Sequence, residues 1–385
     1  MGSFLFPPFH DHHTHISFYS ALCGTADLSS CSSFEEALEI LKKRKEKIIF
    51  ACGWKNNLYD IPRSIADRLP PAAVCNISLH CFVVNSGARE IFSKTHPEIM
   101  RNIDNQDWVE HNLNSVFSLF TDYGDTSLIP VFMERLEKKG ICEAEDMSVS
   151  SEKAALFMAD KYTGRITLWA ETSMYEKYSA ARKYIHGIKL FADGALGAMT
   201  AALSQPCRGG SKKFLLRSDD GMRKCLETAA GYKKNIAVHA IGDAAIEQVL
   251  NSAEEVFGNS CCGAKSGVSL RLEHVQMINR EQALRAKKMG ITLSMQPNFS
   301  GDSVYYSDRL SQHYIQSNNP FRMLIDEAGF VPGKDLIFGS DGMPHGADEA
   351  AKFAFNPPFP SQMLSPEELI KGYSIKNNAM YKKEY

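Results

Sequence analysis

The chain lacks several features that would assign it to a class at once. It contains no run of about 18 apolar residues, so we expect no transmembrane helix. The 43 Lys and Arg nearly balance the 45 Asp and Glu, and no basic patch indicates binding to nucleic acid or to an anionic membrane surface. The N-terminus has no basic stretch followed by an apolar one, so we expect no secretory signal.

The cysteines also lack a pattern. None of the 10 belongs to a C-x-x-C pair, and they are scattered along 385 residues. In a chain of this size, such scattering is typical of reduced thiols and disfavours a framework of disulfides. We therefore expect a cytoplasmic location.

What the sequence does contain is a series of short apolar runs. The runs are continuous rather than alternating, which is typical of parallel strands covered on both faces. Amphipathic stretches lie between them, and this alternation predicts a parallel sheet, closed or open. The length also suits a barrel with insertions. The runs occupy 48–54, 77–84, 166–171, 187–195, 235–243, 269–275, 291–297 and 335–342.

The region at about 54–135 interrupts this rhythm, because it is richer in Pro and Asn and in mixed helical patterns. We interpret it as an insertion packed over one end of a barrel, in the position of a lid. The whole chain, 1–385, is otherwise predicted to form a single domain.

Polar side chains fall where several of the apolar runs end, and a barrel places its active site at these strand ends. His13 and His15 form an H-x-H whose side chains project to the same side of an extended strand. Two imidazoles on one face can bind one metal ion. His239, His274 and Asp341 end three later runs.

Lys189 is anomalous, because it stands inside the apolar run GIKLFADGA. Burial disfavours an ammonium ion and lowers the pKa of the amine. The freed amine could react with CO₂ to give a carbamate that bridges two cations. With the four histidines and Asp341, Lys189 would complete a two-metal shell.

This order, H-x-H, Lys, His, His and Asp, resembles the amidohydrolase superfamily. The phrases GIKLFADGALGAMTAAL, VHAIGDAAIEQVL, RLEHVQMI, SMQPN and GSDGMP look like its YtcJ-like branch, which includes N-substituted formamide deformylase. The resemblance runs from about Pro8 to Tyr381. It implies a TIM (β/α)₈ barrel with a subdomain inserted after the first strand. The β-sandwich segments that flank the barrel in this branch are not evident in the sequence.

The resemblance implies a site for two divalent metal ions, with zinc favoured because the shell is rich in imidazole. The implied ligands of the more buried ion are His13, His15 and Asp341, and those of the second ion are His239 and His274. A CO₂-derived carbamate on Lys189 would bridge the two ions.

The resemblance also implies roles beyond metal binding. A hydroxide between the ions would attack a substrate carbonyl, and Asp341 would act as general base and then as general acid towards the leaving nitrogen. His80 and Asn85 match an H-x₄-N-S pattern of the branch, so we expect His80 to act in catalysis or substrate binding and Asn85 in substrate binding. Trp54 is a further candidate for the substrate pocket.

Two carboxylates stand beside ligand positions. We expect Asp193 and Glu273 to orient the ligands rather than to act as catalysts.

The leading interpretation is hydrolysis of a C–N bond in an amide, formamide or cyclic amide, with a small molecule as substrate. The same site would also hydrolyse a carboxylic ester or lactone. A mononuclear site with unmodified Lys189 and a non-catalytic barrel that serves as a binding or regulatory module are further alternatives, although the intact ligand set argues against the last. Missing sandwich segments would leave barrel surface for a second copy, so a homo-oligomer is compatible with the sequence.

Each motif also has a less specific explanation. The histidines at positions 10, 12, 13 and 15 could form a cluster on the surface. Lys189 could be a salt-bridged residue at a strand edge, and Asp341 could simply cap the turn that follows it.

Overall fold

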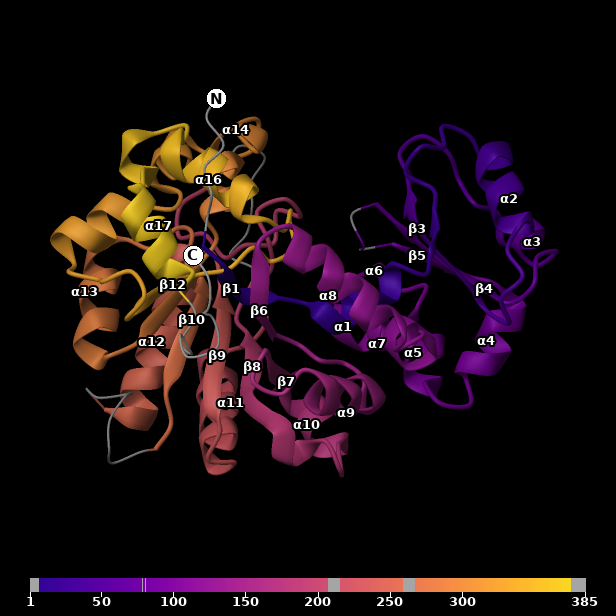
Figure 1. Ribbon diagram of the computed structural model, residues 1–385, viewed down its shortest axis with the longest axis horizontal. Coiled ribbons are helices and arrows are strands. Elements are labelled where there is room, and N and C mark those ends of the chain that lie inside the picture. Colours follow the sequence, from indigo (N-terminus) through magenta and orange to yellow (C-terminus); the bar gives the residue numbers. More distant parts are fainter. Residues whose placement is uncertain (1–6, 78, 80, 207–214, 259–266, 375–385) are drawn as a thin grey trace. The chain divides into compact units, whose positions relative to one another are not determined.

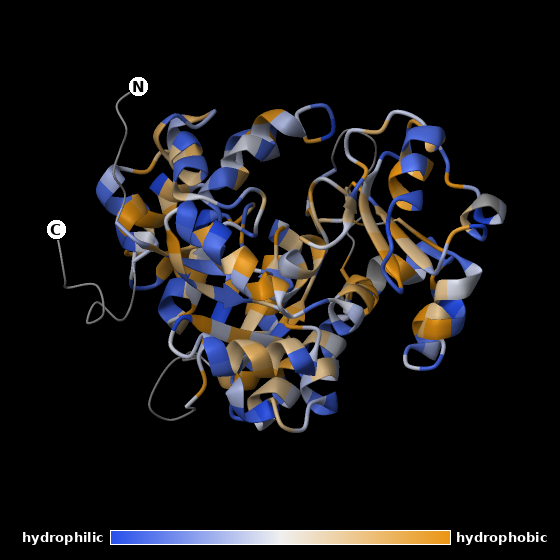
Figure 2. Ribbon diagram, turned by 45° about the vertical axis from the view of Figure 1, so that its right-hand side comes forward, coloured by the Kyte–Doolittle hydropathy of each residue, from blue (hydrophilic) through white to orange (hydrophobic). Residues whose placement is uncertain are grey.

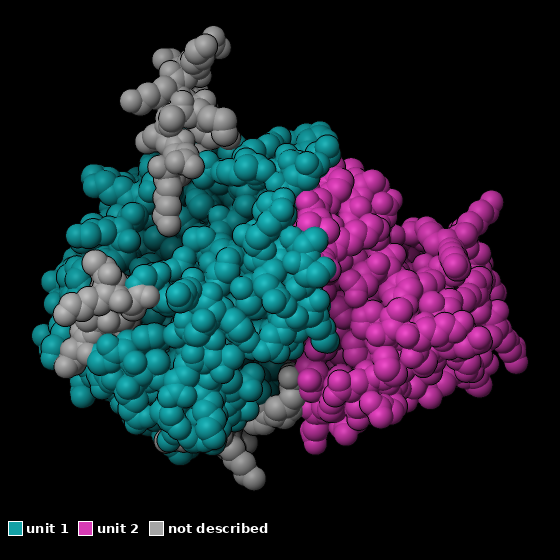
Figure 3. All heavy atoms as spheres, turned by 90° about the horizontal axis from the view of Figure 1, so that it is seen from below, with its two compact units in different colours: residues 1–15, 133–148, 158–385 teal, residues 16–132, 149–157 magenta. Residues whose placement is uncertain are grey.

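The computed structural model describes residues 7–374, apart from 78, 80, 207–214 and 259–266. The chain forms two compact units, which Figure 3 colours teal and magenta. Unit 1 comprises Met1–His15, Met133–Ser148 and Met158–Tyr385, and unit 2 comprises Ile16–Phe132 and Val149–Phe157.

Unit 1 is built on a sheet of eight parallel strands, in the order β1-β6-β7-β8-β9-β10-β11-β12 (Figure 1). Each strand after β1 pairs with the strand before it in this order, as expected for consecutive β/α units. The strands are β1 (Phe9–Thr14), β6 (Ile141–Asp146), β7 (Ile166–Glu171), β8 (Ile185–Phe191), β9 (Asn235–Ala240), β10 (Leu270–His274), β11 (Thr292–Met295) and β12 (Leu336–Phe338).

The first and last strands of this sheet, β1 and β12, are brought together by the segment that follows β12. The backbone N–H of Asp341 donates to the carbonyl of His13 over 2.7 Å. The carboxylate of Asp11 accepts from the backbone N–H of Ser340 over 2.9 Å. These contacts nearly close the sheet into a barrel, so the predicted TIM-like (β/α)₈ architecture is confirmed.

Helices flank the barrel strands (Figure 1). Bands of apolar and polar residues along them in Figure 2 are typical of helices that pack on one face. The α-helices wholly within unit 1 are α10 (Thr172–Lys177), α11 (Asp219–Gly231), α12 (Asp243–Phe257), α13 (Arg280–Met289), α14 (Asp302–Tyr305), α15 (Gln312–Ser317), α16 (Ala347–Phe355) and α17 (Pro366–Gly372). The 3₁₀ turns are η1 (Arg182–Tyr184), η2 (Pro297–Gly301) and η4 (Pro360–Gln362), and η3 (Met323–Glu327) is a π-helical turn.

Unit 2 contains a second sheet of four strands, in which β2, β3 and β4 are parallel and β5 is antiparallel to β4. Its strands are β2 (Ala26–Asp27), β3 (Ile49–Trp54), β4 (Ala72–Asn76) and β5 (Phe82–Val84). Its helices are α1 (Ile16–Leu22), α2 (Phe34–Lys42), α3 (Arg63–Ala66), α4 (Ser86–Phe92), α5 (Pro97–Asn102), α6 (Gln106–His111) and α7 (Leu113–Tyr123). The boundaries of the units fall within α8 (Leu128–Lys138) and α9 (Glu152–Lys161), so each of these helices belongs partly to both.

Three features of the predicted strand series were wrong. The apolar run at 48–54 forms β3, and the described end of the run at 77–84 forms β5, so both belong to the sheet of unit 2 and not to the barrel. The second barrel strand is instead β6, with the sequence ICEAED, which the apolar pattern did not reveal. The reason is physical: β6 buries carboxylates inside the barrel, whereas β3 is an apolar strand of a different core.

The predicted insertion at 54–135 overlaps unit 2, which begins earlier, at Ile16. That the insertion acts as a lid stays a prediction. No helix in the part of the chain that the structure describes is long and apolar enough to cross a bilayer.

We expect Gly187→Ala to lower the free energy of unfolding by about 1–3 kcal/mol, because it overpacks the barrel. A Cβ at this position in β8 would collide with the ring of Trp169 and lie 2.7 Å from the carbonyl oxygen of Asn235. Thermal and urea denaturation measure the change. Gly231→Ala is the matched control, because a Cβ there meets no atom within 4 Å. Equal stability of the two variants would contradict the packing argument.

Candidate metal centre

The first group of potential ligands gathers where β1 ends. Donor atoms of His13, His15 and Asp341 all lie within 4.8 Å of one another. Oδ1 of Asp341 is 3.2 Å from Nε2 of His15 and 3.7 Å from Nε2 of His13. The structure therefore brings together the three residues expected to share one ion.

Two further imidazoles continue this group. The ring of His274, at the end of β10, lies with its centroid 4.6 Å from that of His13 and 4.5 Å from that of His239. Burial, together with the positive charge of Lys189, lowers the pKa of His13 to about 4 and that of His239 to about 3. Burial and the neighbouring histidines likewise hold the pKa of His274 well below its usual value. All three rings are therefore neutral at pH 7, the form that binds metal.

Lys189 lies in β8, and its side chain is almost completely buried, with an exposed fraction of 1%. Its Nζ has no hydrogen-bond partner among the described residues. Burial lowers the pKa of this amine to about 8. A buried amine without a partner is costly, so the surroundings suit a modified or coordinated side chain better than a free ammonium ion.

The hydrogen bonds of the imidazoles select which nitrogen faces the centre. Nδ1 of His13 lies 2.6 Å from a carboxylate oxygen of Glu273, and Nδ1 of His274 lies 2.7 Å from the amide oxygen of Gln296. Nε2 of His239 lies 2.9 Å from the carbonyl oxygen of Gly194. Because these acceptors require an N–H, the opposite nitrogen of each ring keeps its lone pair for a metal.

Both carboxylates predicted to orient ligands lie near imidazoles of the candidate metal centre. Glu273 accepts from His13 and is also paired with Arg271. Asp193 lies 3.6 Å from Nε2 of His239, and it accepts from the backbone N–H groups of Ile241 and Gly242 at the end of β9. Glu273 thus fixes a ring directly, whereas Asp193 chiefly fixes the loop after β9.

Asp341 combines an unusual backbone with an ionised side chain. Its φ is 56°, in the left-handed region that costs a residue other than glycine about 1 kcal/mol or more. Burial raises the pKa of its carboxyl, but a hydrogen bond from His15 and the electrostatic effect of the neighbouring imidazoles of His13 and His274 outweigh burial and lower the pKa below its usual value. A negative carboxylate is therefore held beside the imidazoles.

One side of the centre is accessible to solvent. The side chains of His15 and Asp341 are 23% and 18% exposed, whereas that of His13 is 1% exposed. An incoming molecule would therefore meet His15 and Asp341 first.

A model of the amidohydrolase family matches residues 1–352. The chain belongs to the amidohydrolase family. It is 26% identical over 377 residues to YtcJ of Bacillus subtilis (strain 168), which is named as an amidohydrolase, and the match covers 86% of this chain and 70% of YtcJ. Amidohydrolases are metal-dependent hydrolases. Membership of this family therefore supports a general role in hydrolysis and a requirement for metal.

Two solved structures share the fold. One is an uncharacterized metal-dependent hydrolase from Pyrococcus furiosus, with a TM-score of 0.72 and 24% identity, covering 95% of this chain and 80% of that one. The other, from Pyrococcus horikoshii OT3, carries the same description, with a TM-score of 0.70 and 23% identity, covering 91% and 74%.

Among the remaining predicted site residues of this amidohydrolase, Trp54 and Asn85 belong to unit 2. His80 lies outside the described residues. Asn85 is buried directly before α4, where its Oδ1 accepts hydrogen bonds from the backbone N–H groups of Ala72 and Ala88. Nε1 of Trp54 donates to the carbonyl of Tyr59. Through these contacts Asn85 and Trp54 stabilise the local backbone. That either residue binds a substrate stays a prediction.

Gln296, which bonds His274, was not predicted from the sequence. The sequence feature that could have identified Gln296 is its position as a polar residue directly after the apolar run of β11, in the phrase SMQPN.

We expect Glu273→Gln to weaken metal binding about 10- to 100-fold, as is typical when a carboxylate behind a ligating histidine is lost. The amide keeps the shape of the side chain but withdraws the charge that faces His13 and Arg271. Competition with a chromophoric chelator measures the affinity. Glu281→Gln, which changes an exposed carboxylate on α13, should leave it unchanged. Similar affinities in both variants would show that Glu273 does not tune the centre.

Proposed function

We propose that this chain is a metal-dependent amidohydrolase that hydrolyses the C–N bond of a small amide, formamide or cyclic amide. One observation supports the proposal: ligand-type side chains from the ends of three barrel strands and the loop after a fourth lie close to a buried lysine of β8, and together they form one group. They are His13, His15, Lys189, His239, His274 and Asp341.

The donor set fits divalent metal ions. Neutral imidazoles favour zinc among the common ions, and the carboxylate of Asp341 adds a negative ligand. When bound, such ions supply Lewis acidity, which lowers the pKa of water and polarises a substrate carbonyl. His13, His15 and Asp341 would hold one ion, and His239 and His274 the other.

Lys189 fits the bridging position for a specific reason. With a pKa of about 8, a fraction of its amine is unprotonated at neutral pH. The unprotonated Nζ would form a bond to the carbon of CO₂ and release one proton, so that a buried neutral amine becomes an anionic carbamate. This carbamate on Lys189 would be a ligand for the metal ions.

Asp341 is suited to move a proton. Its ionised carboxylate lies on the accessible side of the centre, with Oδ1 3.2 Å from Nε2 of His15. It would accept a proton from the attacking water and return it to the departing nitrogen. Amines leave poorly without this proton, whereas alcohols need it less, so the arrangement favours amides over esters.

The first test combines metal analysis with a substrate screen. Protein purified without chelator and with bicarbonate should contain two or more metals per chain by plasma mass spectrometry, with about two of them in the candidate metal centre. Amide, formamide and cyclic amide substrates would then be compared with ester and lactone analogues of the same skeleton. Turnover of esters alone would redirect the proposal to ester hydrolysis, and bound metal without turnover of any carbonyl substrate would favour a non-catalytic barrel.

We expect Asp341→Asn to lower kcat at least about 100-fold while retaining more metal than His239→Ala. Asparagine keeps an oxygen for the metal but cannot accept a proton, whereas alanine removes a ligand outright. Steady-state kinetics and metal content of both variants measure the two effects. Retained activity in Asp341→Asn would exclude the proton-transfer role.

We expect bicarbonate to promote metal uptake by the wild type but not by Lys189→Gln. Uptake should be faster above a pH of about 8 than below it, because only the unprotonated amine reacts with CO₂. Lys234→Gln is the matched control, since Lys234 is another lysine whose pKa is lowered by burial. An equal bicarbonate response in Lys189→Gln would leave a mononuclear site with unmodified Lys189 as the better description.

A further inference from the structure

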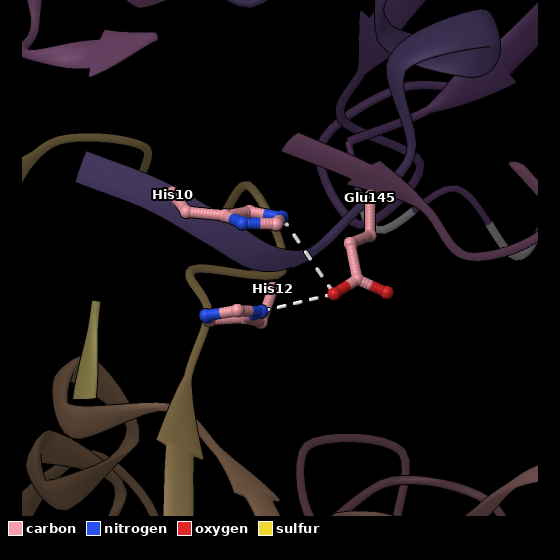
Figure 4. A group of neighbouring side chains, drawn as sticks. All are labelled: His10, His12 and Glu145. Atoms are coloured by element: carbon pink, nitrogen blue, oxygen red, sulfur yellow. Dashed lines mark hydrogen bonds and ion pairs between the residues drawn. The ribbon is translucent and has the colours of Figure 1, made fainter. Parts of the chain in front are cut away.

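A second group of ligand-type side chains lies inside unit 1. Donor atoms of His10, His12 and Glu145 all lie within 4.8 Å of one another, and the three residues are buried. In Figure 4 both imidazoles turn a nitrogen towards the same carboxylate. Neither the candidate metal centre nor the proposed reaction uses these residues. The histidines do not form the surface cluster that the sequence alone allowed.

Neighbouring strands create this group through their side-chain period. His10 and His12 are two residues apart in β1, and Glu143 and Glu145 are two residues apart in β6. Because β1 pairs in parallel with β6, with His10 opposite Glu143, an H-x-H faces an E-x-E. The sequence phrases FHDHHTH and ICEAED therefore meet across one strand pair.

The donor atoms lie close enough together to bind one small metal ion, and His12 and Glu145 share a hydrogen bond without it. Oε1 of Glu145 lies 2.9 Å from Nδ1 of His12 and 3.6 Å from Nε2 of His10. A tetrahedral zinc ion, with bonds of about 2.0–2.2 Å, separates its ligand atoms by about 3.4 Å. The rings of His10 and His12 are stacked with their centroids 4.0 Å apart, which keeps the two nitrogens on the same side of the carboxylate.

The surrounding contacts hold Glu145 in the orientation that a ligand needs. Its other oxygen, Oε2, accepts from Nε1 of Trp169 over 2.7 Å and from Nη1 of Arg271 over 3.0 Å. Oε1 is therefore the oxygen that faces the imidazoles. Nδ1 of His10 lies 3.4 Å from Oε2 of Glu143, so a second carboxylate lies beside the nitrogen that does not face Glu145.

The local charge also favours a cation. Two carboxylates, those of Glu145 and Glu273, contact the single guanidinium of Arg271, so negative groups outnumber it in this described part of the barrel. Buried charge of one sign is stabilised when an ion of the opposite sign is bound. Two imidazoles and a carboxylate are also a donor set that zinc accepts.

We propose that His10, His12 and Glu145 bind a divalent transition-metal ion, zinc by preference, at a site separate from the candidate metal centre. The three side chains leave one position for a water molecule. The ion would cross-link β1 to β6 and so stabilise the barrel. This inference does not depend on the proposed hydrolysis.

The direct test is anomalous X-ray scattering at the zinc edge, on crystals of the wild type grown from protein expressed with zinc. We expect a peak about 2.0–2.2 Å from Nε2 of His10, Nδ1 of His12 and Oε1 of Glu145. A peak only at His13, His15 and Asp341, with none at this group, would overturn the proposal and leave the candidate metal centre intact.

Variants supply an independent readout that needs no activity. His10→Gln and His12→Gln should each contain about one metal per chain less than the wild type by plasma mass spectrometry. Both should also melt at a lower temperature than the wild type. His313→Gln, which alters an exposed histidine of α15, controls for the loss of a histidine and should keep the full metal content. Unchanged metal content in both His10→Gln and His12→Gln would refute the site, and if neither variant folds, the anomalous map of the wild type decides.

Discussion

The pairing of one buried guanidinium with two carboxylates holds the interior of the barrel together. Arg271 contacts Glu145 on β6 and Glu273 on its own strand, β10. Breaking a buried pair by removing one partner typically costs about 3–5 kcal/mol, because a charge is left uncompensated. Glu145 in turn contacts His12, and Glu273 contacts His13. Both histidine groups therefore depend on the same cation, although they are made of different residues.

The positions of the ligand-type residues could be predicted because they obey a simple rule of barrels. His239 and His274 stand at or near the ends of apolar strands, where polar side chains have no structural reason to gather. The same reasoning failed for β6, because it treated apolar content as the mark of a barrel strand. Glu143 and Glu145 are tolerated in β6 since imidazoles, Trp169 and Arg271 satisfy them, and no periodicity reveals partners on other strands.

Other features of the centre have no local signal in the sequence. The nitrogen that each imidazole turns to the centre depends on acceptors from distant segments, such as the carbonyl of Gly194 for His239 and the amide of Gln296 for His274. The left-handed backbone of Asp341 is likewise imposed by the closure of the sheet, where its N–H bonds the carbonyl of His13. Such features arise only when the barrel has formed, and strain of this kind is typical of functional sites.

The two histidine groups meet different physical demands although one strand supplies both. The pairing of β1 with β6 shifts register between Asp11 and Thr14, and this irregularity separates the pair at 10 and 12 from the pair at 13 and 15. The second pair ends at His15, which is partly exposed and lies beside Asp341 with its left-handed backbone. The proposed reaction requires this exposure, because a substrate must reach the centre. The first pair is buried against a carboxylate that other side chains hold in place. An ion there would exchange slowly and add rigidity to the strand that presents His13 and His15, so the proposed structural ion would support the geometry of the reactive centre without taking part in its chemistry.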